Sequence, residues 1–467
     1  MISNYFIRRV MVLGVCAFLF PGFPRIAFAD ETARRIEEET REKLRATESA
    51  KPQSQYRWGL DYGGWVNFLF IDYDDDDNNA ALEDTTDYAT YLDVRPWLKI
   101  TFTEIGQRQH ALYVRMKDLR SNLSPKETAG GSDHDGPHLD YGYCLLDFSP
   151  LWVKGGRQYF TIGQGLAYSD VNDGVEATLL FPRAKIKGFF AHTLPHQENI
   201  DTSIPGYDKS SERNFYGAEY DYTGITSHNL YGFVVVQRDS SDERPQDAEH
   251  DYTYDSRYIG VGARGSFPCR VSYWLEGVKE SGRSFIYEGN IKEDIDAWAG
   301  ILALSYDPDI YSHPSIFFKY AYGSGDKDRV SVTDTFDGNA SGKDRNFLYF
   351  GYIPAGYALA PRLSNLYFFK TGFTVKPLEK IRLFKNCSFG VDYYRYYKAR
   401  KTGGVYDIDA VGMHRDIGYE VDATLSWHIF SDLSCVVQYG YFSPGKAYSA
   451  EANENEKYFS ISTSILF

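Results

Sequence analysis

The chain has 467 residues and a formal net charge of −14, so nucleic acid is not an expected partner, because its phosphates repel an acidic protein. It contains 39 Tyr and 31 Phe, a content typical of membrane barrels with aromatic girdles, although a soluble β-rich protein can share it. The five cysteines show no CxxC motif and no Cys/His spacing, so we expect isolated thiols, no metal site and no cofactor.

Residues 1–29 have the features of an export signal. Arg8 and Arg9 precede an apolar run over 10–20, and Ala27 and Ala29 supply the small residues that signal peptidase accepts. The apolar run is much shorter than the roughly 20 residues of a membrane-spanning helix. We therefore predict a cleaved signal peptide over 1–29.

The next segment, 30–55, is strongly charged and has few apolar stripes. Such a composition predicts a periplasmic N-terminal tail, helical or disordered, that does not belong to a packed core. Too few good heptads are present for a coiled coil.

From residue 56 to residue 467, apolar and polar residues alternate. Over 90–103, Leu92 and Leu98 share one face, and Asp93 and Arg95 share the other. Period-two patterning of this kind indicates strands with one apolar and one wet face. It predicts an all-β fold, a transmembrane antiparallel β-barrel of about 18 strands. The expected strands are 56–71, 88–103, 109–119, 138–148, 151–160, 176–182, 184–193, 214–223, 227–238, 256–267, 269–280, 294–306, 313–322, 364–376, 385–399, 416–430, 432–443 and 455–467.

The predicted connections alternate between short and long, as they do when short turns face the periplasm and long loops face the exterior. A soluble β-sandwich has no reason to alternate in this way. The link over 323–361 is long enough to fold over or into the pore. The acidic run over 72–77 lacks the glycine and the terminal Glu of an EF-hand, so we expect a solvated loop there. The long links are expected near 72–87, 120–137, 161–175, 194–213, 239–255, 281–293, 323–363, 400–415 and 444–454.

The last predicted strand ends on an aromatic residue, Phe467, after alternating apolar positions at Phe459, Ile461 and Ile465. A terminal aromatic on such a strand is the usual recognition signal of the outer-membrane assembly machinery. Pairing of this strand with the first one would close the barrel and leave no hydrogen-bonding edge in lipid. The pattern predicts location in the outer membrane of a Gram-negative bacterium.

Several local motifs resemble those of the alginate-export porin family. They are Asp93-Val-Arg-Pro-Trp97, Gly156-Arg-Gln158, Val175-Glu-Ala177, Tyr322-Gly-Ser-Gly325, Leu363-Ser-Asn-Leu366, Asp416-Ile-Gly-Tyr-Glu-Val-Asp422 and Tyr441-Phe-Ser-Pro-Gly-Lys-Ala-Tyr448. The resemblance implies an 18-stranded barrel with a basic, constricted lumen. It also implies lumen positions for Arg95, Arg157 and Arg362, and it matches Glu420 to an acidic strand position.

The wet faces of the predicted strands supply the candidates for lining the pore and binding a polysaccharide. Arginine suits an anionic sugar chain, because its planar fork binds carboxylates and stays charged. The alternative is that these bases only pair with acids of the lumen, and both interpretations stay open. The candidate bases are Arg95, Lys99, Arg115, Lys117, Arg157 and Arg362, with Lys319 and Lys398 as weaker additions, and the acids are Asp93, Asp392, Glu420 and Asp422.

These observations predict a channel that passively exports an anionic exopolysaccharide, alginate or a similar polymer, through a charged lumen. A general or small-solute diffusion porin is the alternative, and a soluble all-β binding protein is a more distant one. Ser426 and His428 share a predicted lumen face, but no Gly-x-Ser-x-Gly elbow occurs, so we expect no enzyme. Expected partners are outer-membrane lipid and lipopolysaccharide, the anionic polysaccharide, the assembly machinery through Phe467, and periplasmic export proteins.

Overall fold

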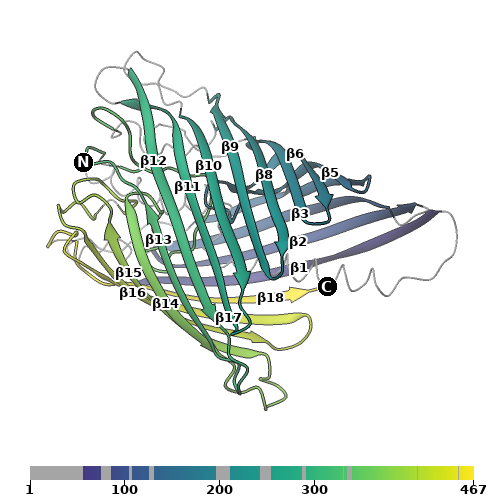
Figure 1. Cartoon of the computed structure of the whole chain (residues 1–467). Helices are drawn as coiled ribbons and strands as arrows, with labels where there is room; N and C mark the ends of the chain where they lie inside the picture. The colour runs from purple at the N-terminus through teal and green to yellow at the C-terminus, as the bar shows by residue number, and fades with distance from the viewer. Residues whose placement is uncertain are drawn as a thin grey trace.

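The computed structural model describes residues 56–74, 86–104, 108–125, 131–195, 211–241, 254–286, 291–329, 331–333, 339–407, 409–450 and 452–467. Within these ranges the chain forms one antiparallel sheet of 18 strands that closes on itself. In Figure 1 the teal strands β8 to β12 cross in front of the purple β1 and the yellow β18. The strands are β1 (Tyr56–Asp74), β2 (Thr86–Glu104), β3 (Gln109–Pro125), β4 (Gly131–Asp147), β5 (Leu151–Thr161), β6 (Ser169–Phe181), β7 (Ala184–His192), β8 (Arg213–Ile225), β9 (His228–Asp239), β10 (Asp255–Ser266), β11 (Val271–Ile286), β12 (Ile291–Tyr306), β13 (Ser315–Gly323), β14 (Leu366–Val375), β15 (Cys387–Lys398), β16 (Asp416–His428), β17 (Leu433–Pro444) and β18 (Glu456–Leu466).

The barrel closes where β18 pairs with β1. The backbone of Phe467 exchanges two hydrogen bonds with Gly64, at 2.9 and 3.0 Å. A Cβ atom at Gly64 would lie 2.6 Å from the Phe467 ring, so only glycine lets the terminal aromatic approach this closely. The predicted closure is confirmed, and the sheet has no open edge among the described strands.

The alternation that predicted the strands separates two faces of the wall. On β2, Asp93 and Arg95 are buried on the inner side, whereas Leu92 and Leu98 are exposed on the outer side. On β12 the inner face is apolar instead, since Ala297 and Ala299 are buried there in a hydrophobic cluster. The outer face is apolar because it meets lipid, and the inner face of strands such as β2 carries polar groups.

All 18 expected strands are present, but several are longer than predicted. The link expected over 120–137 is wrong, since β3 continues to Pro125 and β4 begins at Gly131. In the same way β11 and β12 extend into the link expected over 281–293, and β6 begins at Ser169 rather than at 176. Most residues of these extensions are polar, so period-two hydropathy does not reveal them.

Pro96 lies within β2 and has no backbone N–H to donate. Its pairing with Gly64 of β1 is regular. On the other side, the β2–β3 ladder pairs Val94 and Trp97 but skips Arg95 and Pro96. The proline is therefore accommodated by a local break in one of its two ladders.

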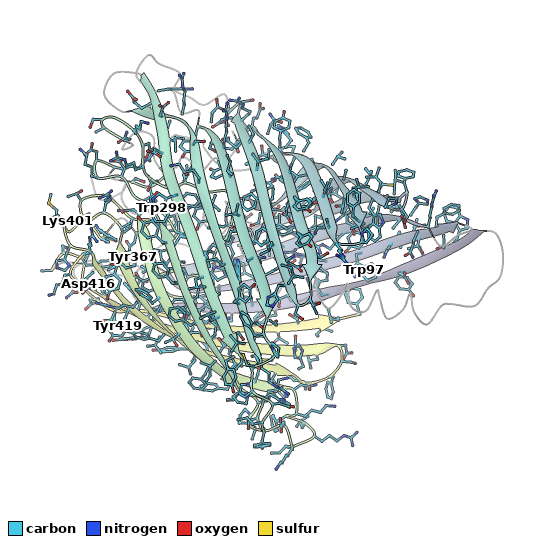
Figure 2. All side chains as sticks on the ribbon, in the orientation of Figure 1. Trp97, Trp298, Tyr367, Lys401, Asp416 and Tyr419 are labelled. Atoms are coloured by element: carbon cyan, nitrogen blue, oxygen red, sulfur yellow. The ribbon has the colours of Figure 1, made fainter. Side chains whose placement is uncertain are left out.

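Aromatic side chains form a belt on the outer face of β12 to β16. Trp298 and Tyr322 stack with ring centroids 4.3 Å apart, and Tyr367 and Tyr397 stack at 5.1 Å. Figure 2 shows Trp298, Tyr367 and Tyr419 along the same side of the barrel. Such rings are typical of a membrane–water interface.

The predicted signal peptide over 1–29, the tail over 30–55 and Asp75 to Asp77 of the acidic run lie outside the described residues. Among the described residues, no helix is long and apolar enough to cross a membrane.

Candidate functional site

The link between β13 and β14 enters the barrel. We call its residues 339–365 the inward loop. Phe347, Leu348 and Leu363 of this loop are buried in one hydrophobic cluster with Tyr258 of β10 and Tyr396 of β15. Both tyrosines lie on the inner wall, so the loop occupies part of the lumen. We predicted that this link folds over or into the pore, and it folds into the pore.

A second link, between β5 and β6, also turns inward, and we call residues 162–168 the short inward segment. The Phe350 N–H donates to the carbonyl of Ala167 at 3.0 Å, and the Ser169 N–H donates to the carbonyl of Phe350 at 3.1 Å. Tyr168 and Phe350 form a parallel bridge. The two segments therefore brace one another and narrow the lumen together.

Glu420 of β16 attaches the inward loop to the wall. Its Oε1 accepts the backbone N–H groups of Tyr357 at 2.5 Å and Ala358 at 2.7 Å. Its Oε2 accepts the Leu359 N–H at 3.2 Å and the Tyr396 hydroxyl at 3.0 Å. A carboxylate that accepts several N–H groups forms strong, charge-assisted bonds. Glu420, which the sequence placed among the pore-lining residues, is fully buried and acts here as an anchor.

Gly356 makes this contact sterically possible. It has a φ of 104°, a region that favours glycine, and a Cβ atom there would lie 2.5 Å from Oε2 of Glu420. The turn preceding Tyr357 can thus press its backbone against the carboxylate. A side chain at this position would separate the two.

Three further wall carboxylates bind inward backbone in the same manner. Glu280 of β11 accepts the Leu348 N–H at 3.0 Å. Glu276 of β11 accepts the Gln164 N–H at 2.8 Å, and Glu219 of β8 accepts the Gly163 N–H at 2.8 Å. Sequence reasoning missed these three residues, because an acidic side chain on a wet face looks the same whether it binds solute or loop backbone.

The basic residues predicted on β2 and β3 do meet on one part of the inner wall, and we call Arg95, Lys99, Arg115 and Lys117 the basic patch. Arg95 forms an ion pair with Asp93 at 2.9 Å. Arg95 and Arg115 share Asp140 of β4, at 3.2 and 2.5 Å. Both arginines are more than nine-tenths buried. Their charges are therefore compensated locally.

Asp140 was not among the predicted site residues. The β3–β4 ladder has two register shifts, between Arg115 and Met116 and between Lys117 and Leu119. The shifts interrupt the alternation of β4, so the face on which Asp140 lies could not be read from its position. Lys117 also has an acidic partner near this irregularity, Asp135 at 3.5 Å.

The expected lumen position of Arg157 is wrong. Its neighbours Gln158 and Phe160 are buried on the inner face, and Phe160 belongs to the cluster around the inward loop. Arg157 alternates with them and so projects from the outer face of β5. It binds Asp173 of β6 through two hydrogen bonds of 2.9 Å each. Val175, which follows Asp173 by two residues and lies on the same face of β6, is 47% exposed, as an outward residue should be.

Arg362 lies on the inward loop rather than on a strand. Its guanidinium donates to the backbone carbonyl of Tyr349 at 2.6 Å and lies 4.9 Å from the centre of the Tyr349 side-chain ring. Burial raises the pKa of Tyr349 above its usual value, so the phenol stays protonated. Arg362 therefore stabilises the fold of the loop.

The remaining candidates lie on β15 and β16, on the other side of the seam between β18 and β1. Asp422 is buried on the inner face of β16, beside Glu420 in the alternation. Asp392 pairs with Lys370 at 2.8 Å, a lysine that the sequence analysis did not select. Lys398 donates to the carbonyls of Ala410 and Gly412 in the β15–β16 link. This part of the wall holds the loops in place.

The sequence matches the family model described as alginate export over residues 71–462, which is most of the chain. The chain belongs to the alginate export family. Among curated proteins, no sequence matches it. Family membership and the closed barrel together support an outer-membrane channel rather than an enzyme.

Solved structures with the same fold include three proteins of Pseudomonas aeruginosa. OccK8 (OprE) has a TM-score of 0.53 and 10% identity, over 87% of this chain and 98% of that chain. OccK5 (OpdH) has a TM-score of 0.52 and 10% identity, with the same coverage of both chains. OccD3 (OpdP) has a TM-score of 0.51 and 10% identity, over 88% of this chain and 91% of that chain. At this identity the likeness shows the fold alone.

Proposed function

We propose that this member of the alginate export family is a passive outer-membrane channel that carries an anionic exopolysaccharide, alginate or a similar polyuronate, out of the cell. The observation that carries the proposal is the basic patch, a group of four cations on two adjacent strands inside a lumen that two inward segments narrow. Cations grouped on a low-dielectric wall raise the local concentration of anionic solute.

The pairing of these cations suits a polymer that must keep moving. A chain of carboxylates bound by unpaired arginines would be held too tightly to leave. Asp93 and Asp140 already occupy part of the guanidinium forks of Arg95 and Arg115. A passing carboxylate would therefore exchange with a protein carboxylate at little net cost, and binding would stay weak at each site.

A small-solute diffusion porin is the second candidate. The observation in its favour is the same local neutralisation, since Arg95, Arg115 and Lys117 all have acidic partners. A wall of paired charges with no excess of either sign would select solutes mainly by size. The two candidates differ in ion preference and in their response to acidic oligosaccharides.

The test is the conductance of the purified barrel in planar bilayers under a salt gradient, with and without oligouronates. The export proposal expects anion preference and block by oligouronates, and both should weaken in the double variant Lys99→Gln/Lys117→Gln. A matched control is Arg157→Gln/Asp173→Asn, which removes charges from the outer face only. Salt of about 1 M should also suppress the block, since it shortens the screening length to about 3 Å.

Cation preference with no oligouronate block in the unaltered protein would overturn the polyuronate proposal and favour the small-solute porin. Location is tested separately by membrane fractionation. We expect the protein in the outer-membrane fraction, with a gel mobility that changes on heating.

A further inference from the structure

The inner face of β2 to β4 carries a row of three aromatic rings, Trp97, Tyr113 and Tyr143, which we call the aromatic row. The ring centroids of Trp97 and Tyr113 lie 6.0 Å apart with planes 25° from parallel. Those of Tyr113 and Tyr143 lie 5.1 Å apart with planes 24° from parallel. Near-parallel rings at these distances overlap in a stagger, so the row presents ring edges and the uncovered part of each ring face to the lumen.

This surface faces the lumen. The residues next to it in the alternation, Leu98 and Leu112, are 41% and 47% exposed on the outer face. Trp97, Tyr113 and Tyr143 are half-buried, so part of each ring borders the interior of the barrel. Figure 2 places Trp97 well away from the girdle residues Trp298, Tyr367 and Tyr419. Since the row lies on the inner face of the wall, it is not part of the lipid-facing girdle.

Cations border the aromatic row on two sides. The Lys154 ammonium lies 3.9 Å from the centre of the Tyr143 ring. Lys99 is the direct β-ladder partner of Tyr113. One level further along the strands, the Arg115 guanidinium lies over the rings of Tyr141 and Trp65, at 3.9 and 4.9 Å. Aromatic and cationic groups therefore alternate over a small area of wall, and Lys154 covers one face of Tyr143.

A sugar ring matches this arrangement in both of its parts. One face of a pyranose presents C–H groups, which pack on an aromatic ring, while its edge carries hydroxyls and, in a uronate, a carboxylate. An apolar patch inside a polar lumen is a typical feature of a ligand site, with a few polar groups at its border. Lys99 is the ladder partner of Tyr113 and Lys154 lies over Tyr143, so both cations are near the edge groups of a sugar packed against the lumen side of these rings.

We propose that the aromatic row is a sugar-stacking subsite, on which successive pyranose rings of the exported chain rest as they pass the basic patch. The proposal builds on the proposed function for the identity of the polymer. Stacking itself does not depend on charge. A neutral oligosaccharide should therefore use the row as well, with shorter residence because it lacks the carboxylates that Lys99 and Lys154 would bind.

The experiment records single-channel block by an oligouronate and by a neutral oligohexose of the same length. Trp97→Ala, Tyr113→Ala and Tyr143→Ala are each compared with Tyr367→Ala, a matched variant in the outer girdle. Each change in the row should shorten the block by about three- to tenfold for both sugars, because a lost ring contact mainly raises the dissociation rate. Tyr143→Phe should retain the block, and Tyr367→Ala should leave it unchanged.

Leucine variants at the same three positions keep the apolar volume and remove the flat ring, so they serve where an alanine variant fails to assemble. Unchanged block durations in assembled variants would overturn the subsite even if the unaltered channel is blocked by uronates. If neither sugar blocks the unaltered channel, the subsite proposal is overturned too. Block by neutral sugars alone, lost in the row variants, would support the subsite while the polyuronate function fails.

Discussion

Replacing Glu420 by glutamine tests whether the inward loop is held by wall carboxylates. In the native protein, Oε1 accepts the N–H groups of Tyr357 and Ala358, and Oε2 accepts the N–H of Leu359 and the hydroxyl of Tyr396. A glutamine keeps one carbonyl oxygen but presents an NH₂ group at the other position. The Leu359 N–H would then face a donor, whereas the Tyr396 hydroxyl could turn to accept.

The magnitude follows from these contacts. Two bonds to Oε1 lose their charge assistance, and one buried N–H loses its acceptor. A hydrogen bond to a charged group contributes about 1.5 to 3 kcal/mol, and a buried unpaired donor costs about 1 to 3 kcal/mol. We expect the free energy of docking the loop onto the wall to become less favourable by about 3 kcal/mol, which raises the ratio of undocked to docked loop roughly 150-fold.

The assay combines single-channel recording with limited proteolysis of the inward loop. Glu420→Gln should show brief openings to a larger conductance and faster cleavage within 339–365. Asp392→Asn is the matched control, because its carboxylate lies on the neighbouring strand and pairs with Lys370 instead of the loop. If Glu420→Gln keeps the native conductance and protease resistance, the loop is held by its apolar cluster and the reasoning from the carboxylate is refuted.

Three further predictions concern assembly and stability. Deletion of Phe467 should sharply reduce the heat-modifiable barrel in the outer membrane, because the backbone pair with Gly64 is lost; native amounts would contradict the role given to the terminus. Gly64→Val should reduce assembly in the same assay, since its Cβ would meet the Phe467 ring at 2.6 Å, whereas Gly277→Ala, with no atom within 4 Å, should assemble normally. Arg213→Met should lower the free energy of unfolding in denaturant by about 3 to 5 kcal/mol, because it leaves the buried Asp239 without its 2.7 Å partner. The double change Arg213→Met/Asp239→Asn should restore part of that loss, because asparagine removes the buried charge and keeps an acceptor for one of the two N–H groups, of Ser241 and Tyr254, that bind Asp239; a double variant no more stable than the single one would argue against the ion-pair explanation.

The sequence by itself determined the number and order of the strands, and the outer face of those that alternate cleanly. Period-two hydropathy is local, and a wall that separates lipid from polar groups imposes it, as Leu92 and Asp93 illustrate on β2. The alternation over 455–467 likewise indicated closure, because a strand with a lipid-facing side needs a partner for its free edge. Strand ends were less certain wherever polar residues predominate, as at the β3–β4 hairpin.

Only the tertiary structure decided what the polar side chains do. Both faces of β5 mix apolar and polar residues, so the side on which Arg157 lies could not be read from alternation and was assigned wrongly. Glu420 looks like any wet-face acid until the inward loop, more than 50 residues away along the chain, brings its N–H groups to it. Asp140 meets Arg95 and Arg115 through strand pairing that two register shifts displace. A contact between distant segments depends on how the barrel and its loops pack, and no local pattern encodes that.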